Sequence, residues 1–239
     1  MTVHIAPHIP PHITPELIIF DCDGTLTDSE AVHNRAVADV LADLGYPHYD
    51  FEYCMTHFAG RGMHNVVAAI EAQEGVTLPD HFVPSYVRLF LERMATQIEP
   101  VKGAPEAVAY LASRYKTCVA SNGEPESVTQ SVQAIGLYPL FGAERIFTKS
   151  QVARGKPYPD LFLFAAEKMG AAPESCVVVE DSLTGVQAGL AAGMHVIGLT
   201  AVAHHPEKTA NDMKALGVPA IFSNWGEIVD YIKSIEGCG

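Results

Sequence analysis

The chain has 239 residues, of which 48% are hydrophobic and 18% charged, a composition typical of a folded globular protein that excludes disorder throughout. Fifteen Lys and Arg against 28 Asp and Glu give a formal net charge of −13, and such an acidic surface repels polyphosphate backbones and anionic lipid. We therefore expect neither nucleic acid nor a membrane as a partner, and the lack of a membrane-spanning apolar run favours a cytoplasmic protein.

The N-terminal segment combines histidines with prolines. His4, His8 and His12 recur every four residues, but the prolines among them rule out a helix that would align the three rings. We expect residues 1–15 to form a flexible tail and not a metal site.

Short apolar runs alternate with helical patterns along most of the chain. The first run, at 17–20, is apolar throughout, which is typical of a strand buried on both faces. Later apolar runs lie at 118–120, 145–147, 176–179, 195–199 and 220–222, and helical spacing appears between them at 128–135, 161–165 and 186–191. Strands that alternate with helices predict an α/β fold with a parallel sheet and right-handed crossovers.

Residues 29–100 break this alternation, because they carry helical patterns without a comparable apolar strand. The patterns lie around 29–44, 61–74 and 82–97. We expect an inserted helical domain over 29–100, and a core formed by 16–28 and 101–239. Ser29 is expected to cap the first inserted helix, and the Pro- and Gly-rich segment at 100–105 is expected to return the chain to the core.

The five cysteines are widely spaced and form no Cys-x-x-Cys pair. This usage suits a reducing compartment and argues against a zinc site. We expect all five to be small apolar residues of the interior: Cys22, Cys54, Cys118, Cys176 and Cys238.

Four polar clusters follow predicted strands, where open parallel sheets bind their ligands. The first cluster runs from Asp21 through Asp23 and Gly24 to Asp28. Two carboxylates spaced by two residues would face opposite sides of a regular strand. Both can serve one site only if the chain leaves strand geometry, which Gly24 permits.

The second and third clusters offer groups for an anion. Ser121 and Asn122 end a strand shortly before a helix that starts at Pro125, and a hydroxyl beside a helix N-terminus can bind an anion. A turn or capping role for Ser121 is the alternative. Lys156 lies between Gly155 and a proline that restricts the backbone, which makes a held cation as well supported as the alternative, a solvated surface charge.

The fourth cluster places Glu180 and Asp181 at the end of the apolar run 176–179. Burying uncompensated carboxylates costs several kcal/mol, so the pair requires a cation or many hydrogen-bond donors. Oxygen ligands favour a hard ion, and Mg²⁺ is the first expectation.

These four clusters in this order resemble the haloacid dehalogenase superfamily of phosphotransferases, and the resemblance spans about residues 16–236. The insert is similar in position and helical character to the cap of the subclass that holds beta-phosphoglucomutase and small sugar-phosphate phosphatases. The resemblance therefore implies a Rossmann-like parallel sheet core with an inserted helical cap domain.

The resemblance also implies a role for each site residue. Asp21 is the expected nucleophile and Asp23 the general acid and base, while Ser121 and Lys156 hold the phosphate and Asn122 adds a donor. The expected ligands of Mg²⁺ are Asp21, the backbone carbonyl of Asp23, and Asp181, with Glu180 as a further ligand or an acid behind them.

Substrate choice is expected to depend on the insert, which would close over the substrate and exclude water. Its basic residues are Arg35, Arg61, Arg88 and Arg93. Arg61, in a small-residue turn before a helix, is the candidate for contacting the end of the substrate that is not transferred; a solvated surface Arg is the alternative. His33 matches a position occupied by His in beta-phosphoglucomutase, and a packed or solvent-facing His is the alternative.

We therefore predict a Mg²⁺-dependent phosphatase that hydrolyses a small phosphorylated metabolite, a sugar or polyol phosphate, through an aspartyl phosphate, as a monomer or homodimer. A beta-phosphoglucomutase-like mutase is the alternative: Arg61 has a counterpart there, but the cap lysine of that enzyme has none, since residues 29–100 contain no Lys. The helical insert argues against a non-catalytic phospho-accepting regulator, because such a regulator needs no lid. Asp23 argues against a dehalogenase, because displacement of halide needs no acid at that position. The missing cap lysine also disfavours phosphonate hydrolysis.

Overall fold

The structure is a computed structural model that describes residues 15–236. The expected N-terminal tail, apart from Pro15, and Cys238 lie outside the described residues. The chain divides into two compact units. One consists of the residues up to Thr27 and those from Pro100 onward, and the other is Asp28–Glu99.

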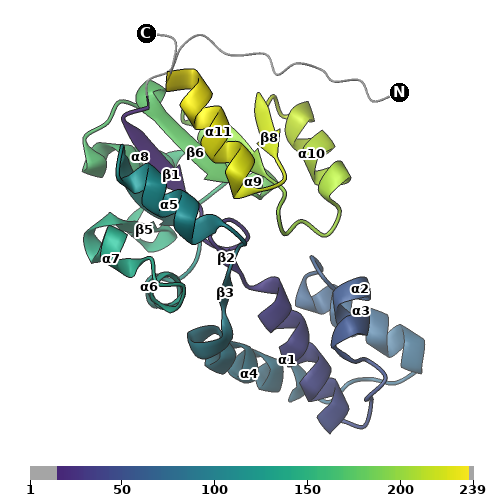
Figure 1. Cartoon of the computed structure of the whole chain (residues 1–239). Coiled ribbons are helices and arrows are strands. Elements are labelled where there is room, and N and C mark those ends of the chain that lie inside the picture. Colours follow the sequence, from purple (N-terminus) through teal and green to yellow (C-terminus); the bar gives the residue numbers. More distant parts are fainter. Residues whose placement is uncertain (1–14, 237–239) are drawn as a thin grey trace. The chain divides into compact units, whose positions relative to one another are not determined.

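The first unit is built on a parallel sheet of six strands, of which Figure 1 labels β1, β5, β6 and β8. The strands are β1 (Leu17–Phe20), β4 (Lys116–Ser121), β5 (Ile146–Thr148), β6 (Cys176–Glu180), β7 (His195–Leu199) and β8 (Ala220–Phe222). Their order in the sheet is β5-β4-β1-β6-β7-β8, and every neighbouring pair is parallel. The predicted α/β fold is confirmed, and the strands that carry the four polar clusters are neighbours.

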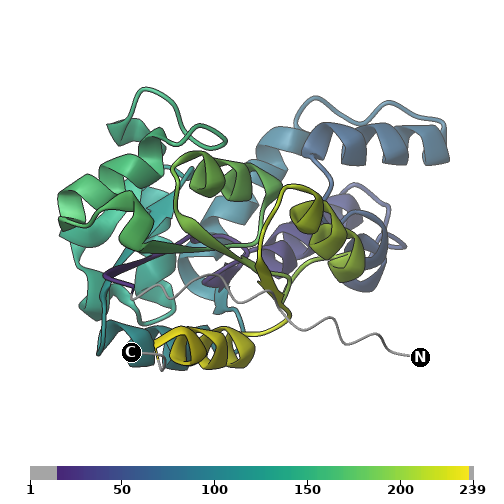
Figure 2. The ribbon, with the colours of Figure 1, turned by 90° about the horizontal axis from the view of Figure 1, so that it is seen from above.

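Helices cover both faces of this sheet, and Figure 2 shows α8 and α9 on one side with α5 and α11 together on the other. The helical segments of the unit are α5 (Ala104–Ala112), α6 (Pro125–Ala134), α7 (Tyr138–Phe141), α8 (Asp160–Met169), α9 (Leu183–Ala191), α10 (Pro206–Ala215) and α11 (Trp225–Glu236), with short 3₁₀ turns at Ala143–Arg145, Lys149–Gln151 and Pro173–Ser175. Both faces of the sheet are therefore buried, which explains why the middle of each strand is apolar.

Alternate residues of β1 serve the two sides of the sheet. Leu17 and Ile19 belong to the core under α8 and α9, whereas Phe20 packs edge-on against Phe141 and Trp225 on the opposite side. Four of the cysteines, Cys22, Cys54, Cys118 and Cys176, are buried free thiols, as predicted.

The second unit, Asp28–Glu99, has a core of its own. It contains α1 (Glu30–Asp43), α2 (Phe51–His57), α3 (Met63–Glu74) and α4 (Phe82–Gln97). Among the buried side chains of its core are Val37, Leu41, Tyr49, Cys54, Val66, Ile70 and Phe82. The chain leaves and re-enters the first unit through two short paired strands, β2 (Thr27–Asp28) and β3 (Glu99–Pro100).

The expected cap of the first inserted helix is wrong in one respect. Ser29 is the N-cap residue of α1, but its side chain makes no capping hydrogen bond because its backbone is already helical, with φ −83° and ψ −14°. The carboxylate of Asp28 accepts from the backbone N–H of Glu30 instead, at 3.2 Å. None of the helices within residues 15–236 combines the length and the hydropathy needed to cross a membrane.

Candidate active site

The loop after β1 leaves strand geometry where Gly24 allows it, as predicted. Gly24 has φ +86°, and its N–H donates to the carbonyl of Thr27 at 2.7 Å. Asp21 is only 8% exposed, and its N–H donates to the carbonyl of Val179 in β6 at 3.0 Å. Asp23 is exposed, and the hydroxyl of Thr27 donates to its Oδ1 at 3.3 Å. The turn thus gives the two carboxylates different environments.

Lys156 is held between two carboxylates. Its Nζ lies 2.5 Å from Asp21 Oδ1 and 2.5 Å from Glu180 Oε1, and the residue is 8% exposed. The ammonium also lies 4.8 Å from the centre of the Phe162 ring. Lys156 is therefore a held cation, and the alternative of a solvated surface charge is wrong.

Glu180 is the last residue of β6, and Asp181 follows it. The carboxylates of both residues accept hydrogen bonds from neighbouring residues of the site. Glu180 is fully buried, and its Oε2 accepts from both the N–H and the hydroxyl of Ser182, at 3.1 and 2.9 Å. Asp181 Oδ1 accepts from the hydroxyl of Thr25 at 3.0 Å. A Cβ on Gly24 would lie 2.0 Å from Asp181 Oδ2, so a glycine at this position is required by the close approach as well as by φ.

The second and third clusters are joined to each other. Ser121 is buried at the end of β4, and its Oγ accepts from the N–H of Gly123 at 3.0 Å. The amide of Asn122 bonds to the backbone of Lys156 at both ends: Oδ1 accepts from its N–H at 2.9 Å, and Nδ2 donates to its carbonyl at 3.0 Å.

The site carries uncompensated negative charge. Asp21, Glu180 and Asp181 each offer a carboxylate oxygen within 4.8 Å of the others, so with all three ionised and Lys156 charged the formal charge is −3 + 1 = −2. Burial, reinforced by the charge of Glu180, raises the pKa of Asp21 to about 7 against the opposing effect of Lys156. Burial and the neighbouring carboxylates also raise the pKa of Asp181. These three acidic residues could hold a metal ion, and a hard divalent cation fits their oxygen donors.

The four arginines of the second unit differ in their partners. Arg35 lies over the ring of Phe51 at 4.3 Å, Arg88 pairs with Glu92, and Arg93 pairs with Asp39. Within the part of the chain that the structure describes, the guanidinium of the exposed Arg61 has no side-chain partner.

Arg61 is nevertheless presented by an ordered turn. Gly60, in the left-handed conformation at φ +71°, donates its N–H to Glu30 Oε1 at 2.8 Å. The same oxygen accepts from the amide of the fully buried Asn34 at 3.0 Å. Glu30 thus links α1 to the turn that carries Arg61.

His33 is partly buried on α1 and bonded through one ring nitrogen. Its Nδ1 lies 2.5 Å from the hydroxyl of Tyr86 in α4, and the two rings meet edge-on. Burial lowers the pKa of His33 and outweighs the opposing charge of Glu30. His33 is therefore packed within its own unit.

Sequence reasoning missed the residues that support this site. Thr25, Ser182, Glu30 and Tyr86 each bond to a predicted site residue or to its loop. Hydroxyls are common in any turn, so only the places of Thr25 and Ser182 beside Asp23 and Asp181 carried a signal. Glu30 and Tyr86 lie on helices α1 and α4, where no local pattern marked them.

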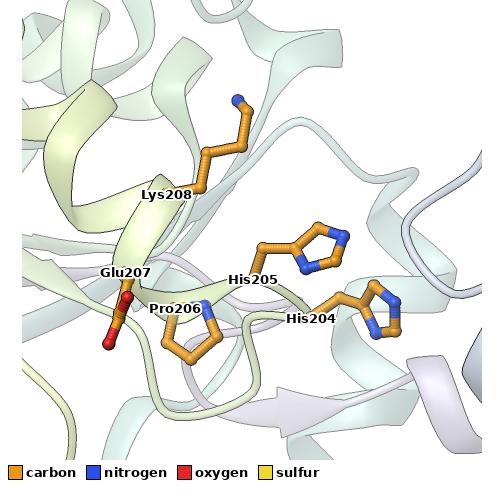
Figure 3. Close-up of a pocket in the computed structure, with 5 residues that line it drawn as sticks. All are labelled: His204, His205, Pro206, Glu207 and Lys208. Carbon is orange, nitrogen blue, oxygen red and sulfur yellow. The ribbon is translucent and has the colours of Figure 1, made fainter.

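A hollow of about 550 Å³ lies on the loop after β7, which ends at the same edge of the sheet as the acidic cluster. It is lined by His204, His205, Pro206, Glu207 and Lys208. Figure 3 shows both imidazoles on one side of the loop and the carboxylate of Glu207 pointing away from them. Among the described residues, this group does not meet the spacing of a metal cluster.

A parallel α/β sheet with a buried acid cluster and a held lysine at its carboxyl edge, interrupted by a helical insert, defines a class of hydrolytic enzymes. Residues 15–193 match the haloacid dehalogenase-like hydrolase family, and the chain belongs to that family.

Similar proteins fall in the same family. The chain is 30% identical over 200 residues to 6-phosphogluconate phosphatase of Escherichia coli, covering 81% of this chain and 89% of that protein. It is 33% identical over 210 residues to hexitol phosphatase A of the same organism, covering 82% and 88%. The crystal structure of a HAD family hydrolase from Deinococcus radiodurans with bound phosphate and sodium superposes with a TM-score of 0.79 at 32% identity, covering 92% of this chain and 96% of that one.

Proposed function

We propose that this protein is a Mg²⁺-dependent phosphatase that hydrolyses a sugar or polyol phosphate through an aspartyl phosphate on Asp21. The observation that carries the proposal is the contact of Lys156 with both Asp21 and Glu180, beside Asp181. A nucleophilic carboxylate next to a fixed ammonium and a surplus of negative charge suits a reaction that needs charge neutralisation more than covalent assistance.

The donor set fits Mg²⁺, because all the available groups are oxygens and burial raises the pKa values of Asp21 and Asp181 in the absence of a cation. We assign Asp21, Asp181 and the backbone carbonyl of Asp23 as its ligands. Both oxygens of Glu180 already accept from Lys156 or Ser182, which favours the role of an acid behind the ligands. When bound, Mg²⁺ supplies positive charge that lets a carboxylate approach an anionic phosphate.

In the first step, a carboxylate oxygen of Asp21 attacks phosphorus, and the bond between phosphorus and the ester oxygen breaks. Lys156 and Ser121 bind the non-bridging phosphate oxygens and hold the group in line. Asp23 donates its proton to the departing alkoxide, which leaves as an alcohol.

In the second step, water hydrolyses the aspartyl phosphate. Asp23, now a carboxylate, removes a proton from the water, and the products are free Asp21 and inorganic phosphate. The exposure of Asp23 and its hydrogen bond from Thr27 suit a group that exchanges protons in both steps.

Two observations favour hydrolysis of a sugar or polyol phosphate over a mutase. Residues 29–100 contain no Lys, so the cap lysine of beta-phosphoglucomutase has no counterpart. Two relatives at 30% identity or more are a phosphogluconate phosphatase and a hexitol phosphatase by name. Arg61, with its unpaired guanidinium within the described chain, is the residue we propose for the end of the substrate that is not transferred. His33 is a second candidate through its Nε2, since Nδ1 is engaged by Tyr86.

The test is a phosphate-release screen over hexose, hexitol and aldonate phosphates, with p-nitrophenyl phosphate as a generic substrate, each in Mg²⁺ and in excess EDTA. We expect Mg²⁺-dependent release of many equivalents of phosphate from at least one sugar or polyol phosphate. A hexose 1-phosphate converted to its 6-phosphate without release would establish the mutase instead. A single turnover that stalls would establish a phospho-accepting regulator.

A further inference from the structure

Asn122 joins the loop after β4 to the loop after β5. Its Oδ1 accepts from the N–H of Lys156 at 2.9 Å, and its Nδ2 donates to the carbonyl of the same residue at 3.0 Å. We propose that Asn122 is a positioning residue that fixes the backbone of Lys156 and thereby places its ammonium between Asp21 and Glu180. This inference rests on the proposed phosphatase function. It changes the expected role of Asn122 from a hydrogen-bond donor to the phosphate into a positioning residue for Lys156.

The chemistry of the two bonds makes Asn the required residue type. Both partners belong to the main chain of Lys156, so together they fix the peptide groups on either side of its Cα. One bond needs an acceptor and the other a donor, which a carboxamide supplies from a single short side chain. Asp would keep the acceptor, lose the donor and place a charge opposite a carbonyl.

The neighbouring glycine is a separate observation that points to the same contact. A Cβ on Gly155 would lie 2.5 Å from Asn122 Oδ1 and 3.2 Å from its Cγ. Gly155 therefore leaves the space that the Asn122 carboxamide occupies. The requirement is one of space, since Gly155 is not among the glycines with positive φ.

The position of the Lys156 backbone matters because its side chain is buried and its ammonium contacts two carboxylates at once. Its Nζ is 2.5 Å from each of two carboxylates, one directly after β1 and the other at the end of β6. A backbone shift of about 1 Å at Lys156 would break this geometry, and displacements of that size in a reacting site lower rates by about 100-fold.

A double-mutant cycle between Asn122 and Lys156 separates positioning from direct phosphate contact. We expect Asn122→Ala to lower kcat for p-nitrophenyl phosphate by about 100-fold. In a Lys156→Ala background, the same substitution should change kcat by less than about 2-fold, because the effects of two residues that act as a unit are not additive. The Mg²⁺-dependent affinity for inorganic phosphate, measured by calorimetry, should likewise change by less than about 2-fold in that background. An equal further loss in the Lys156→Ala background would overturn the proposal and assign Asn122 to the phosphate.

A second measurement reads the contact without turnover, and so separates failure of this inference from failure of the proposed function. Hydrogen–deuterium exchange in the peptide that spans residues 149–158 should be faster in Asn122→Ala and in Gly155→Ala than in the wild type. Asn211→Ala, at an exposed site on α10, is the control and should leave this exchange unchanged. Unchanged exchange in both variants overturns the positioning role even if the wild type proves to be a phosphatase. Gly155→Ala keeps the carboxamide intact, so it decides the matter if Asn122→Ala does not fold.

Discussion

Asp21 is the single side chain on which the proposed chemistry depends. Asp21→Asn keeps an oxygen that can accept from Lys156 but cannot form an acyl phosphate, so we expect turnover to fall by about 10⁴-fold or more. Phosphate release by purified protein, with mass spectrometry to exclude deamidation, measures the loss. A variant that retains more than a few per cent of wild-type activity would remove Asp21 from the nucleophile role.

Arg61 tests whether the second unit selects the substrate. Loss of a charged hydrogen bond is worth about 1.5–3 kcal/mol, so Arg61→Ala should raise KM for the best sugar or polyol phosphate by about 10-fold or more. KM for p-nitrophenyl phosphate should stay within a factor of about two, because that substrate lacks a polyol end. The control is Arg88→Ala, which removes an exposed arginine paired with Glu92 and should change neither value. Equal effects on both substrates would contradict a selective contact.

At the residue scale, the sequence predicts which side chains lie at the strand ends but not what they touch. Asp21 and Asp181 follow apolar strands, and the parallel order places β1 beside β6, so their approach follows from topology. The double contact of Lys156 does not follow, because a lysine in a loop can equally be solvated. The hydroxyl of Ser182 on Glu180 depends on side-chain rotamers that no local pattern encodes.

At the element scale, the start of α9 packs directly on the acidic cluster. A Cβ on Gly185 would lie 1.8 Å from Glu180 Oε1, a group already held by Lys156. Helix propensity favours Ala over Gly by about 1 kcal/mol, yet overpacking costs about 1–3 kcal/mol, so we expect Gly185→Ala to lower the free energy of unfolding. Urea denaturation measures the change.

The matched control is another glycine in the first turn of a helix. A Cβ on Gly226 in α11 would meet only the tip of the Asn224 side chain, at 3.2 Å. Gly226→Ala should be close to neutral in the same urea experiment. If Gly185→Ala is as stable as Gly226→Ala, the packing of α9 against Glu180 is looser than the structure indicates.

Element boundaries could be predicted where apolar periodicity and proline coincide. The pattern over 82–97 matches α4, and Pro125 begins α6. Helix α2 escaped prediction because only seven residues carry it and just one of them, Cys54, is buried. Ser29 is the N-cap residue of α1, as predicted, but the hydrogen bond at this helix start is accepted by Asp28, because both are good capping residues and the local φ and ψ decide between their side chains.

At the scale of the whole molecule, the acidic cluster links stability to pH. Folding raises the pKa of Asp21 from its ordinary value near 4 to about 7, so the folded state binds this proton more tightly. The stabilisation is fully present below the ordinary pKa and is lost as pH rises through 7. Burial lowers the pKa values of His33 and His195, so these two residues make the free energy of unfolding increase as pH rises towards the ordinary pKa of histidine.

The contribution of Asp21 is isolated by comparison with Asp21→Asn. In excess EDTA, we expect the variant to gain stability relative to the wild type as pH rises from 5 to 8, because it lacks the carboxyl that loses its proton. Mg²⁺ should then stabilise the wild type more at pH 8 than at pH 5. Thermal unfolding of both proteins at several pH values gives the difference, and a difference independent of pH would contradict the raised pKa.

The indole of Trp225 has one further consequence. This residue is the only Trp in the chain, it is 1% exposed, and its Nε1 donates to the backbone carbonyl of Thr25 at 3.1 Å. Thr25 in turn donates to Asp181, so an intrinsic fluorophore is bonded to the loop that carries the nucleophile. Emission from this single indole should report cation arrival in real time, and stopped-flow mixing with Mg²⁺ would time that event in the unlabelled protein.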